Sequence, residues 1–369
     1  MTRAGSLWPQ LTSWDNLYEA AKGAAAGKRS RPGVAAYLLD YENEVARLRR
    51  TLLDGTYRPG PYRSFVIREP KERMISAAPF RDRVVHHALT RILEPVFEPR
   101  FTSRSFASRK GFGSHQALEL AIEACGRHRY VLKCDIRKYF PSIDHAILKQ
   151  ELRRVLKCRP TLALAERIID GSNRQEPVVE YFPGDTLFTP HERRRGLPLG
   201  NQTSQFFANV YLNSLDHLVL RELRPGEYAR YVDDFVLFSN SKNELWSMRQ
   251  RIDQHLDSLR LRAHERKSRI YRTADGLTFL GWQITPQGVW LKRDSVVRQR
   301  RRLRWMEREY AAGRMEWAEV RQRIQSWLGH AQWGDTWRLR QQMFDQVAFF
   351  SSAVAELSSR PRVLAKLGP

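Results

Sequence analysis

The sequence predicts an α+β fold in which short apolar strands alternate with amphipathic helices. Residues 130–135 and 228–238 are apolar runs of strand length that end or turn at aspartates. The segment after Gly200 carries apolar residues at helical spacing. After Lys292 the chain becomes strongly basic and helical, which indicates a separate unit.

Length, composition and charge limit the classes of protein to consider. At about 150 residues per domain, 369 residues suggest two or three packed units. The 63 Lys and Arg against 40 Asp and Glu give a net charge of +23, which favours nucleic acid over an acidic membrane as partner. No apolar run reaches the roughly 18 residues of a membrane span, and Met1 to Gln10 lacks a signal-peptide segment. The three cysteines form no CxxC, so a soluble protein of a reducing compartment is expected.

The N-terminal third reads as helices on either side of a strand region. Residues 37–53 are predicted to form a polar helix that ends at the Asp54-Gly55 turn. Residues 60–75 have strand character, and 81–93 return to helix. The apolar face of this last helix is formed by Val84, Val85, Leu89 and Leu93.

The middle and end of the chain are more regular. Strand 130–135 is followed by a break at Pro141 and a helix whose apolar face runs from Ile147 to Leu156. Residues 170–195 read as a loop or hairpin excursion before the helix that follows Gly200. The remaining strands are expected at 228–238, 277–284 and 289–291, the last two joined by a turn at 286–288.

Three carboxylates stand where strands end. Asp135 closes one strand, and Asp233 and Asp234 form the turn of Tyr231-Val-Asp-Asp234. Adjacent acids between apolar strands repel one another, a cost that divalent cations offset. Two ions about 4 Å apart can activate an attacking oxygen and stabilise a departing pyrophosphate. Taken alone, an aromatic-x-Asp-Asp string occurs by chance in about one chain in ten of this size, and aspartate is common in turns.

The order of further motifs is more specific than the acids alone. Asp135-Ile-Arg-Lys-Tyr-Phe140 comes first, then Leu199-Gly-Asn-Gln-Thr-Ser-Gln205, and Phe279-Leu-Gly-Trp282 follows the acid pair. From about Trp14 to about Phe344 the chain resembles the reverse transcriptases, in particular those of diversity-generating retroelements. The resemblance implies a right-hand polymerase with fingers at 1–129, a palm with an antiparallel sheet at 130–291, and a helical, basic thumb and tail at 292–369.

The resemblance also implies roles for individual residues. Asp135 and Asp233 would be the main ligands of two magnesium ions (manganese is possible), with Asp234 supporting and the Ile136 carbonyl a further ligand. Lys267 would protonate the pyrophosphate leaving group or contact a phosphate. The positions matching contacts to the deoxynucleoside triphosphate are Lys71, Arg73, Phe140, Leu199, Gly200 and Gln205. The positions matching template or primer contacts are Arg109, Lys110, Phe279, Leu280, Gly281 and Trp282.

Two of these positions carry the subtype prediction. Most reverse transcriptases have a glutamine where this chain has Leu199 and a proline where it has Gln205. The glutamine normally contacts the incoming nucleotide, and one lost hydrogen bond is worth roughly 0.5–1.5 kcal/mol, up to about tenfold in selectivity. The resemblance therefore implies error-prone copying, and Phe140, five positions after Asp135, implies exclusion of ribonucleotides.

The implied partners are a structured template RNA, a primer or growing cDNA, and a small basic accessory protein that forms an oligomer. The implied location is the cytoplasm of a bacterium or of a phage-infected host. Three alternatives stay open: the reverse transcriptase of another bacterial retroelement or of an antiviral defence system, an RNA-binding protein that has lost catalysis, and an RNA-dependent RNA polymerase.

Overall fold

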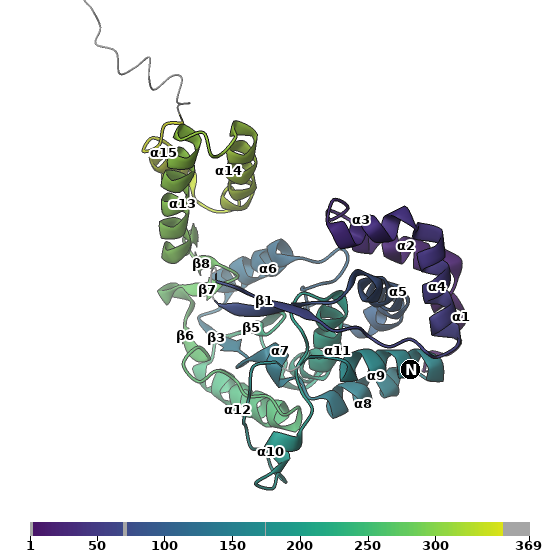
Figure 1. The fold of residues 1–369 in the computed structure, drawn as a ribbon. Helices are drawn as coiled ribbons and strands as arrows, with labels where there is room; N and C mark the ends of the chain where they lie inside the picture. The colour runs from purple at the N-terminus through teal and green to yellow at the C-terminus, as the bar shows by residue number, and fades with distance from the viewer. Residues whose placement is uncertain (1–2, 69–71, 174, 350–369) are drawn as a thin grey trace, which may run out of the picture. The chain divides into compact units, whose positions relative to one another are not determined.

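A computed structural model describes residues 3–68, 72–173 and 175–349 (Figure 1). Its contacts divide the described chain into two compact units. The first runs to Leu120 and resumes over Tyr130–Tyr271, and the second combines Ala121–Arg129 with the chain from Arg272 onward. Helices and antiparallel strands are mixed, which confirms the predicted α+β class. The bounds of fingers, palm and thumb stay predictions, although the contacts group residues 272–291 with the C-terminal helices.

Helices form the N-terminal part of the first unit. Ser13 begins the second of them, because its hydroxyl accepts the N–H of Asn16. The helix predicted at 37–53 is two helices, since the chain bends at Asp40 and the second helix ends at Asp54 as expected. Helix α5 packs against α2, and the four apolar residues predicted for its face are fully buried. The helices are α1 (Trp8–Leu11), α2 (Trp14–Ala25), α3 (Pro32–Leu39), α4 (Tyr41–Leu53) and α5 (Phe80–Phe97).

A hairpin connects α4 to α5 in the sequence. Strands β1 (Arg63–Ile67) and β2 (Arg73–Ala77) pair antiparallel, with Arg63 opposite Ala77. All five residues of β1 are exposed, whereas β2 is partly buried. A short 3-10 turn (Glu98–Arg100) follows α5. The strand character predicted for 60–75 is confirmed for 63–67 and 73–75, and residues 69–71 lie outside the described residues.

A four-stranded sheet forms the centre of the first unit, in the order β4-β5-β3-β6. Strand β5 is almost entirely buried and pairs antiparallel with both neighbours. Helix α12 packs against β3 and β5, and α11 packs against α5, α8 and α12. The strands are β3 (Tyr130–Asp135), β4 (Glu227–Tyr231), β5 (Asp234–Ser239) and β6 (Arg269–Arg272). The helices are α7 (Tyr139–Ser142), α8 (His145–Val155), α9 (Arg159–Asp170), α11 (Gln202–Leu218) and α12 (Lys242–Ser258), with a π-helical turn at Val219–Leu223.

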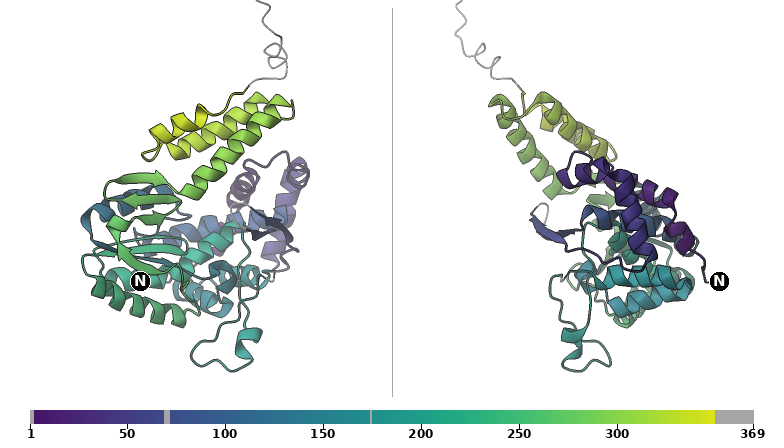
Figure 2. Two further views of the ribbon diagram at one scale, coloured as in Figure 1. Left: turned by 90° about the vertical axis from the view of Figure 1, so that its left-hand side faces the viewer. Right: turned by 45° about the vertical axis from the view of Figure 1, so that its right-hand side comes forward.

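The excursion predicted at 170–195 contains one short helix, α10 (Thr189–Glu192), and extends away from the sheet (Figure 2). It is nonetheless tied down at several points. Arg262 donates to the Tyr181 carbonyl at 2.9 Å and lies over the ring of Phe182. Arg137 pairs with Glu180 at 2.8 Å. These contacts attach residues 180–182 of the excursion to the rest of the first unit.

The second unit consists of a small sheet and a group of helices. Leu303, Met306, Met315, Val320 and Met343 form the core of the helical part. The turn predicted at 286–288 joins β8 to β9, and segment 277–284 is itself a hairpin that turns at Leu280-Gly281. Its elements are β7 (Leu277–Phe279), β8 (Trp282–Thr285), β9 (Gly288–Leu291), α13 (Arg293–Ala311), α14 (Trp317–Ala331) and α15 (Trp337–Phe344), after a 3-10 turn at Thr273–Asp275. Helix α6 (Ser114–Arg127) spans the boundary between the units in sequence.

Two further expectations concern the whole described chain. Cys125, Cys134 and Cys158 are buried and form no disulfide, as their spacing predicts. Among the helices that the structure describes, none combines the length and the apolar character needed to cross a bilayer.

Candidate active site

Strand pairing brings the three predicted carboxylates together. Asp135 is the last residue of β3 and lies opposite Asp234, the first residue of β5. Directly opposed residues of an antiparallel pair share one face of the sheet. Asp233 precedes Asp234 in the two-residue turn between β4 and β5, and its carbonyl accepts the N–H of Ile136 at 3.2 Å. Acids about a hundred residues apart in the chain thus meet where β3 ends and β5 begins.

The electrostatic surroundings oppose full ionisation of the Asp233–Asp234 pair. Burial, and after it the charge of Asp135, raises the pKa of Asp233 to about 6. The cations of Arg73 and Lys267 act in the opposite direction. Burial also raises the pKa of Asp234 to about 7, although Lys133 Nζ lies 3.3 Å from its Oδ2. Two acids whose pKa values approach neutrality in a partly open position are typical of a functional site.

The donor set fits a divalent cation in its chemistry, but the side chains do not surround a common point. Within the described residues, no three His, Cys, Asp or Glu side chains group closely enough to hold a metal ion. Asp135 Oδ1 accepts from Lys267 Nζ at 2.8 Å, so a lysine holds this carboxylate. Asp234 Oδ1 is buried and lacks a hydrogen-bond partner in the described part of the chain. A hard cation relieves both an orphaned carboxylate oxygen and the repulsion between neighbouring acids.

Two basic residues act on these acids. Lys267 comes from the turn after α12, and the neighbouring Ser268 Oγ accepts the N–H of Asp135 at 3.3 Å. Arg73 is the exposed first residue of β2, and its charge lowers the pKa of Asp233. Lys71, the other predicted triphosphate contact, lies outside the described residues.

The residues predicted to contact the nucleotide occupy two connected segments. Phe140 is half-buried on α7, with its ring centroid 5.5 Å from that of Tyr139. The Phe140 carbonyl accepts the N–H of Leu197, which joins α7 to the segment that leads to Leu199. The Leu199 carbonyl in turn accepts the N–H of Ser76 on β2 at 3.0 Å. Backbone hydrogen bonds therefore connect Phe140, the residue predicted to contact the ribose, to the Leu199 segment and through it to the β1–β2 hairpin.

Gly200 and Gln205 differ in what surrounds them. Gly200 has φ +101°, and a Cβ there would lie 2.9 Å from Ile75 Cγ2, so both the backbone and the space require glycine. Gln205 is exposed near the start of α11, and its Oε1 accepts from Ser108 Oγ at 3.2 Å. Gln205 thus contacts the segment predicted to bind the template.

Arg109, predicted to bind phosphate, contacts protein groups in the structure described, and its role at a phosphate stays a prediction. Only 4% of its side chain is exposed, and its guanidinium pairs with Glu98 and donates to the carbonyls of Thr102 and Ser105. It also stacks over the ring of Phe112, 3.9 Å from the centroid. These contacts use its donors to shape the loop, so Lys110, which is exposed, is the residue left to meet a phosphate.

The four residues predicted to contact the primer, 279–282, differ in exposure. Phe279 and Trp282 are buried, with 0% and 1% exposed, because they pair across the β7–β8 hairpin and pack inside the second unit. Their contact with a primer stays a prediction. Leu280 and Gly281 form the turn, both with positive φ, and Gly281 is exposed. The turn itself is the part of this motif that can approach nucleic acid.

Sequence reasoning missed Arg230, which organises the turn that carries Asp233. It is fully buried in β4, and its Nε and Nη2 donate to Asp216 at 2.7 and 2.6 Å. Nη2 also donates to Ser105 Oγ at 2.8 Å, and Nη1 to the Val232 carbonyl at 2.9 Å. Val232 has φ +59°, which is unusual for a β-branched residue. An arginine between the apolar residues Ala229 and Tyr231, three positions before Asp233, was the available signal.

A family model described as reverse transcriptase (RNA-dependent DNA polymerase) matches residues 67–284 of the chain. This match includes the three carboxylates, Arg73, Phe140, Leu199 and Lys267. It covers more than half of the sequence.

Curated proteins with similar sequences include a bacterial protein and two intron-encoded proteins. Protein YkfC of Escherichia coli (strain K12) is 26% identical over 281 residues, 65% of this chain and 71% of YkfC. The group II intron-encoded protein LtrA of Lactococcus lactis subsp. cremoris is 28% identical over 185 residues, 49% of this chain and 29% of LtrA. The putative COX1/OXI3 intron 1 protein of Saccharomyces cerevisiae is 22% identical over 311 residues, 69% of this chain and 36% of that protein. The similarity thus spans about a third of the two intron-encoded proteins.

Proposed function

The chain belongs to the reverse transcriptase family of RNA-dependent DNA polymerases, and on this basis we propose that it copies a structured RNA into error-prone cDNA for a diversity-generating retroelement. The observation that supports the catalytic part is the register of β3 with β5. It sets Asp135 opposite Asp234 and beside the turn of Asp233.

In this proposal the acids hold the metal ions that enzymes of this family generally use. Asp135 and Asp233 would be the main magnesium ligands, with Asp234 and the Ile136 carbonyl in support. When bound, the ions supply Lewis acidity toward the primer 3′-hydroxyl and the phosphate oxygens. The raised pKa values of Asp233 and Asp234 support the assignment, because a cation favours the ionised form of both acids.

The basic and aromatic residues would act on the nucleotide. Arg73, with Lys71, would bind the triphosphate, and a position from which its charge lowers the pKa of Asp233 supports this role. Lys267 Nζ lies 2.8 Å from Asp135 and would donate a proton or a hydrogen bond to the pyrophosphate. The half-buried ring of Phe140 would exclude a 2′-hydroxyl by filling its place.

Primer extension on RNA tests the catalytic proposal. Wild-type protein with magnesium and deoxynucleotides should extend a DNA primer, and Asp233→Ala should lose at least about 10³-fold in rate because it removes a charge on which transition-state stabilisation depends. Asp253→Ala is the matched control, since Asp253 is a half-exposed aspartate paired with Arg249 on α12. Extension by Asp233→Ala at the wild-type rate would contradict the proposal.

The subtype rests on Leu199 and Gln205. Leu199 is half-buried, and its backbone carbonyl accepts the N–H of Ser76. Because its side chain is aliphatic, it offers the base pair no polar contact. We expect Leu199→Gln to reduce misincorporation up to about tenfold, as one regained hydrogen bond allows. Sequencing of cDNA from both proteins on one template is the measurement, and identical error spectra would refute this role. A template RNA and a small basic accessory oligomer are the partners that the subtype adds.

Another bacterial retroelement is the alternative, favoured by the similarity to the group II intron-encoded LtrA. The two readings differ in the neighbourhood of the gene. In a diversity-generating element, the gene has a variable repeat and its invariant template copy nearby. The gene of an intron-encoded protein instead lies within the intron. Inspection of the flanking sequence distinguishes them.

A further inference from the structure

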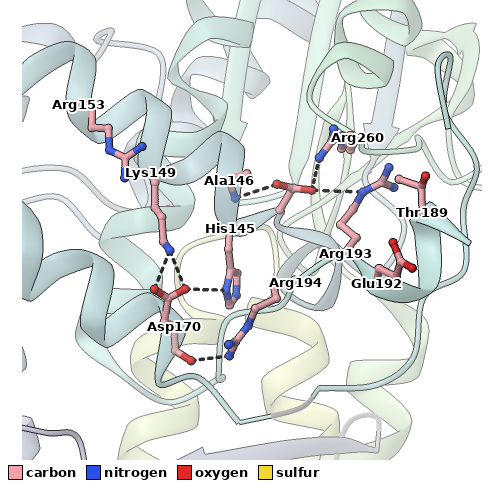
Figure 3. Close-up of a pocket in the computed structure, with 11 residues that line it drawn as sticks. His145, Ala146, Lys149, Arg153, Asp170, Thr189, Glu192, Arg193, Arg194 and Arg260 are labelled. Atoms are coloured by element: carbon pink, nitrogen blue, oxygen red, sulfur yellow. Dashed lines mark hydrogen bonds and ion pairs between the residues drawn. The ribbon is translucent and has the colours of Figure 1, made fainter. Parts of the chain in front are cut away.

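A basic hollow of about 510 Å³ lies between the start of α8 and the 170–195 excursion (Figure 3). Asp135, Asp233 and Asp234 are not among the residues that line it. Its wall carries five basic residues and three carboxylates, and two of the basic residues also pair with carboxylates outside the wall, Arg153 with Glu166 and Arg193 with Asp185. The basic residues are Lys149, Arg153, Arg193, Arg194 and Arg260.

Two of the carboxylates hold part of this charge in fixed positions. Both oxygens of Asp170 accept from Lys149 Nζ, at 2.6 and 2.7 Å. Asp144 is 1% exposed, and its Oδ2 accepts from Arg260 Nη1 at 2.7 Å and lies 3.4 Å from Arg193 Nε. Burial and paired contacts make this side of the wall rigid, so a ligand would meet cations that are already ordered.

Arg194 is the cation that these carboxylates do not neutralise. It is exposed, and its guanidinium donates to the backbone carbonyl of Asp170 at 2.6 Å. In the part of the chain that the structure describes, no carboxylate lies within ion-pair distance of Arg194 or of its neighbour Arg195. Burial, and after it the charge of Arg193, lowers the pKa of Arg195, which lines an adjoining hollow together with Arg194. An anion placed here would relieve this repulsion.

His145 adds a different requirement. Only 4% of its side chain is exposed, and Nε2 lies 2.9 Å from the Gly196 carbonyl. Because a carbonyl only accepts, Nε2 carries the hydrogen and Nδ1 presents a lone pair. Nδ1 has no hydrogen-bond partner in the described structure, and the nearest carboxylate, Asp170, is 4.0 Å away and is also an acceptor. Figure 3 shows His145, Lys149 and Arg194 arranged around Asp170 on the wall of the hollow. A ligand hydroxyl group would supply the donor that Nδ1 lacks.

We propose that this hollow binds the ribose-phosphate backbone of RNA, with a phosphate at Arg194 and a 2′-hydroxyl that donates to His145 Nδ1. The combination of a cation without a carboxylate partner and a buried neutral acceptor distinguishes RNA from DNA, because only ribose supplies the hydroxyl. This inference rests on the proposed function, since it names a template contact away from the carboxylates. The run Arg193–Arg195 leads directly into the Leu197–Gly200 segment, so bound RNA would brace the chain that carries Leu199.

Equilibrium binding tests the site without catalysis. The probes are a 30-nucleotide RNA and the DNA of the same sequence, titrated into full-length protein without magnesium or nucleotides at several salt concentrations. Arg194→Gln should weaken RNA binding about three- to tenfold and reduce the slope of log K against log salt by about one. Arg58→Gln is the matched control, since Arg58 is likewise exposed and donates to backbone carbonyls.

His145→Gln tests the hydroxyl contact, because glutamine can keep a donor for the Gly196 carbonyl. It should lower affinity for RNA about threefold and leave DNA affinity unchanged. Equal losses on RNA and DNA would overturn the ribose assignment, and Arg194→Gln indistinguishable from Arg58→Gln would overturn the site. Inactive wild-type protein with the expected binding losses would instead reject the proposed function and support the site.

Discussion

Replacing Arg230 by methionine should both destabilise the first unit and impair catalysis. Arg230 and Asp216 are 0% exposed, and the guanidinium donates to Asp216, Ser105 and the Val232 carbonyl. Arg230→Met leaves the Asp216 carboxylate buried without its countercharge, which costs about 3–5 kcal/mol. For a unit of this size that loss lowers Tm by on the order of 10 °C.

The catalytic effect has a separate cause. Nη1 of Arg230 holds the carbonyl of Val232, the residue with φ +59° directly before Asp233. Without this contact the turn is free to relax toward a less strained conformation, which moves the Asp233 carboxylate. We expect kcat in primer extension to fall on the order of 100-fold, measured well below the Tm of the variant, with the KM for primer–template unchanged.

A double variant separates the two effects. Adding Asp216→Asn to Arg230→Met removes the buried charge and leaves an oxygen for Tyr228, whose hydroxyl donates to Asp216 at 2.7 Å. More than half of the lost stability should return, as neutralising an unpaired buried ion allows, whereas kcat should not recover. Recovery of kcat together with stability would refute a positioning role for Arg230. A single variant that loses less than about 1 kcal/mol would refute the buried pair itself.

Three further predictions follow from the described contacts. Phe140→Ala should lower discrimination against ribonucleotides by on the order of 10- to 100-fold, and competition between a ribonucleotide and its deoxy form measures this; unchanged discrimination would reject Phe140 as the gate. Gly200→Ala should lower the free energy of unfolding by about 1–3 kcal/mol in a urea titration, because φ is +101° and the new Cβ meets Ile75. Gly33→Ala, which has open space around its Cβ position, should leave that free energy nearly unchanged. Burial lowers the pKa of His86 from 6.5 to about 3, so below pH 6.5 the unfolded chain binds a proton that the folded one does not, and stability falls as pH falls toward 3. The loss between pH 7 and 5 should be on the order of 2 kcal/mol in urea unfolding, and His86→Met should flatten this dependence; an equally steep dependence in the variant would exclude His86 as its source.

The sequence was sufficient where local pattern and tertiary structure agree. Strand 130–135 has the predicted bounds, and the turn of Asp233 lies between two strands as expected. Apolar runs bounded by acids leave few alternatives to a buried strand. The closeness of Asp135 and Asp234 was predicted through a resemblance, since the pattern alone does not fix which strands pair.

Sequence reasoning does not give the burial of a residue type that has two uses. Arginine is a residue type that often contacts phosphate, yet the guanidinium of Arg109 donates its hydrogen bonds to Glu98 and to two backbone carbonyls. Phe279 and Trp282 flank a glycine turn as a surface motif would, yet both are core residues because they face each other across the hairpin. In each case the deciding quantity is burial, which depends on partners distant in sequence. The break at Asp40 was missed because both halves of that helix keep helical spacing.

The β1–β2 hairpin has a consequence for how the protein behaves before substrate arrives. A two-stranded sheet with one wholly exposed strand has little intrinsic stability, whereas β3 and β5 are enclosed on both sides. Backbone amides of the hairpin should therefore exchange with deuterium far sooner than those of the central strands. Arg73 is the first residue of β2 in this hairpin, so triphosphate binding by Arg73, as proposed above, would include the cost of ordering the hairpin.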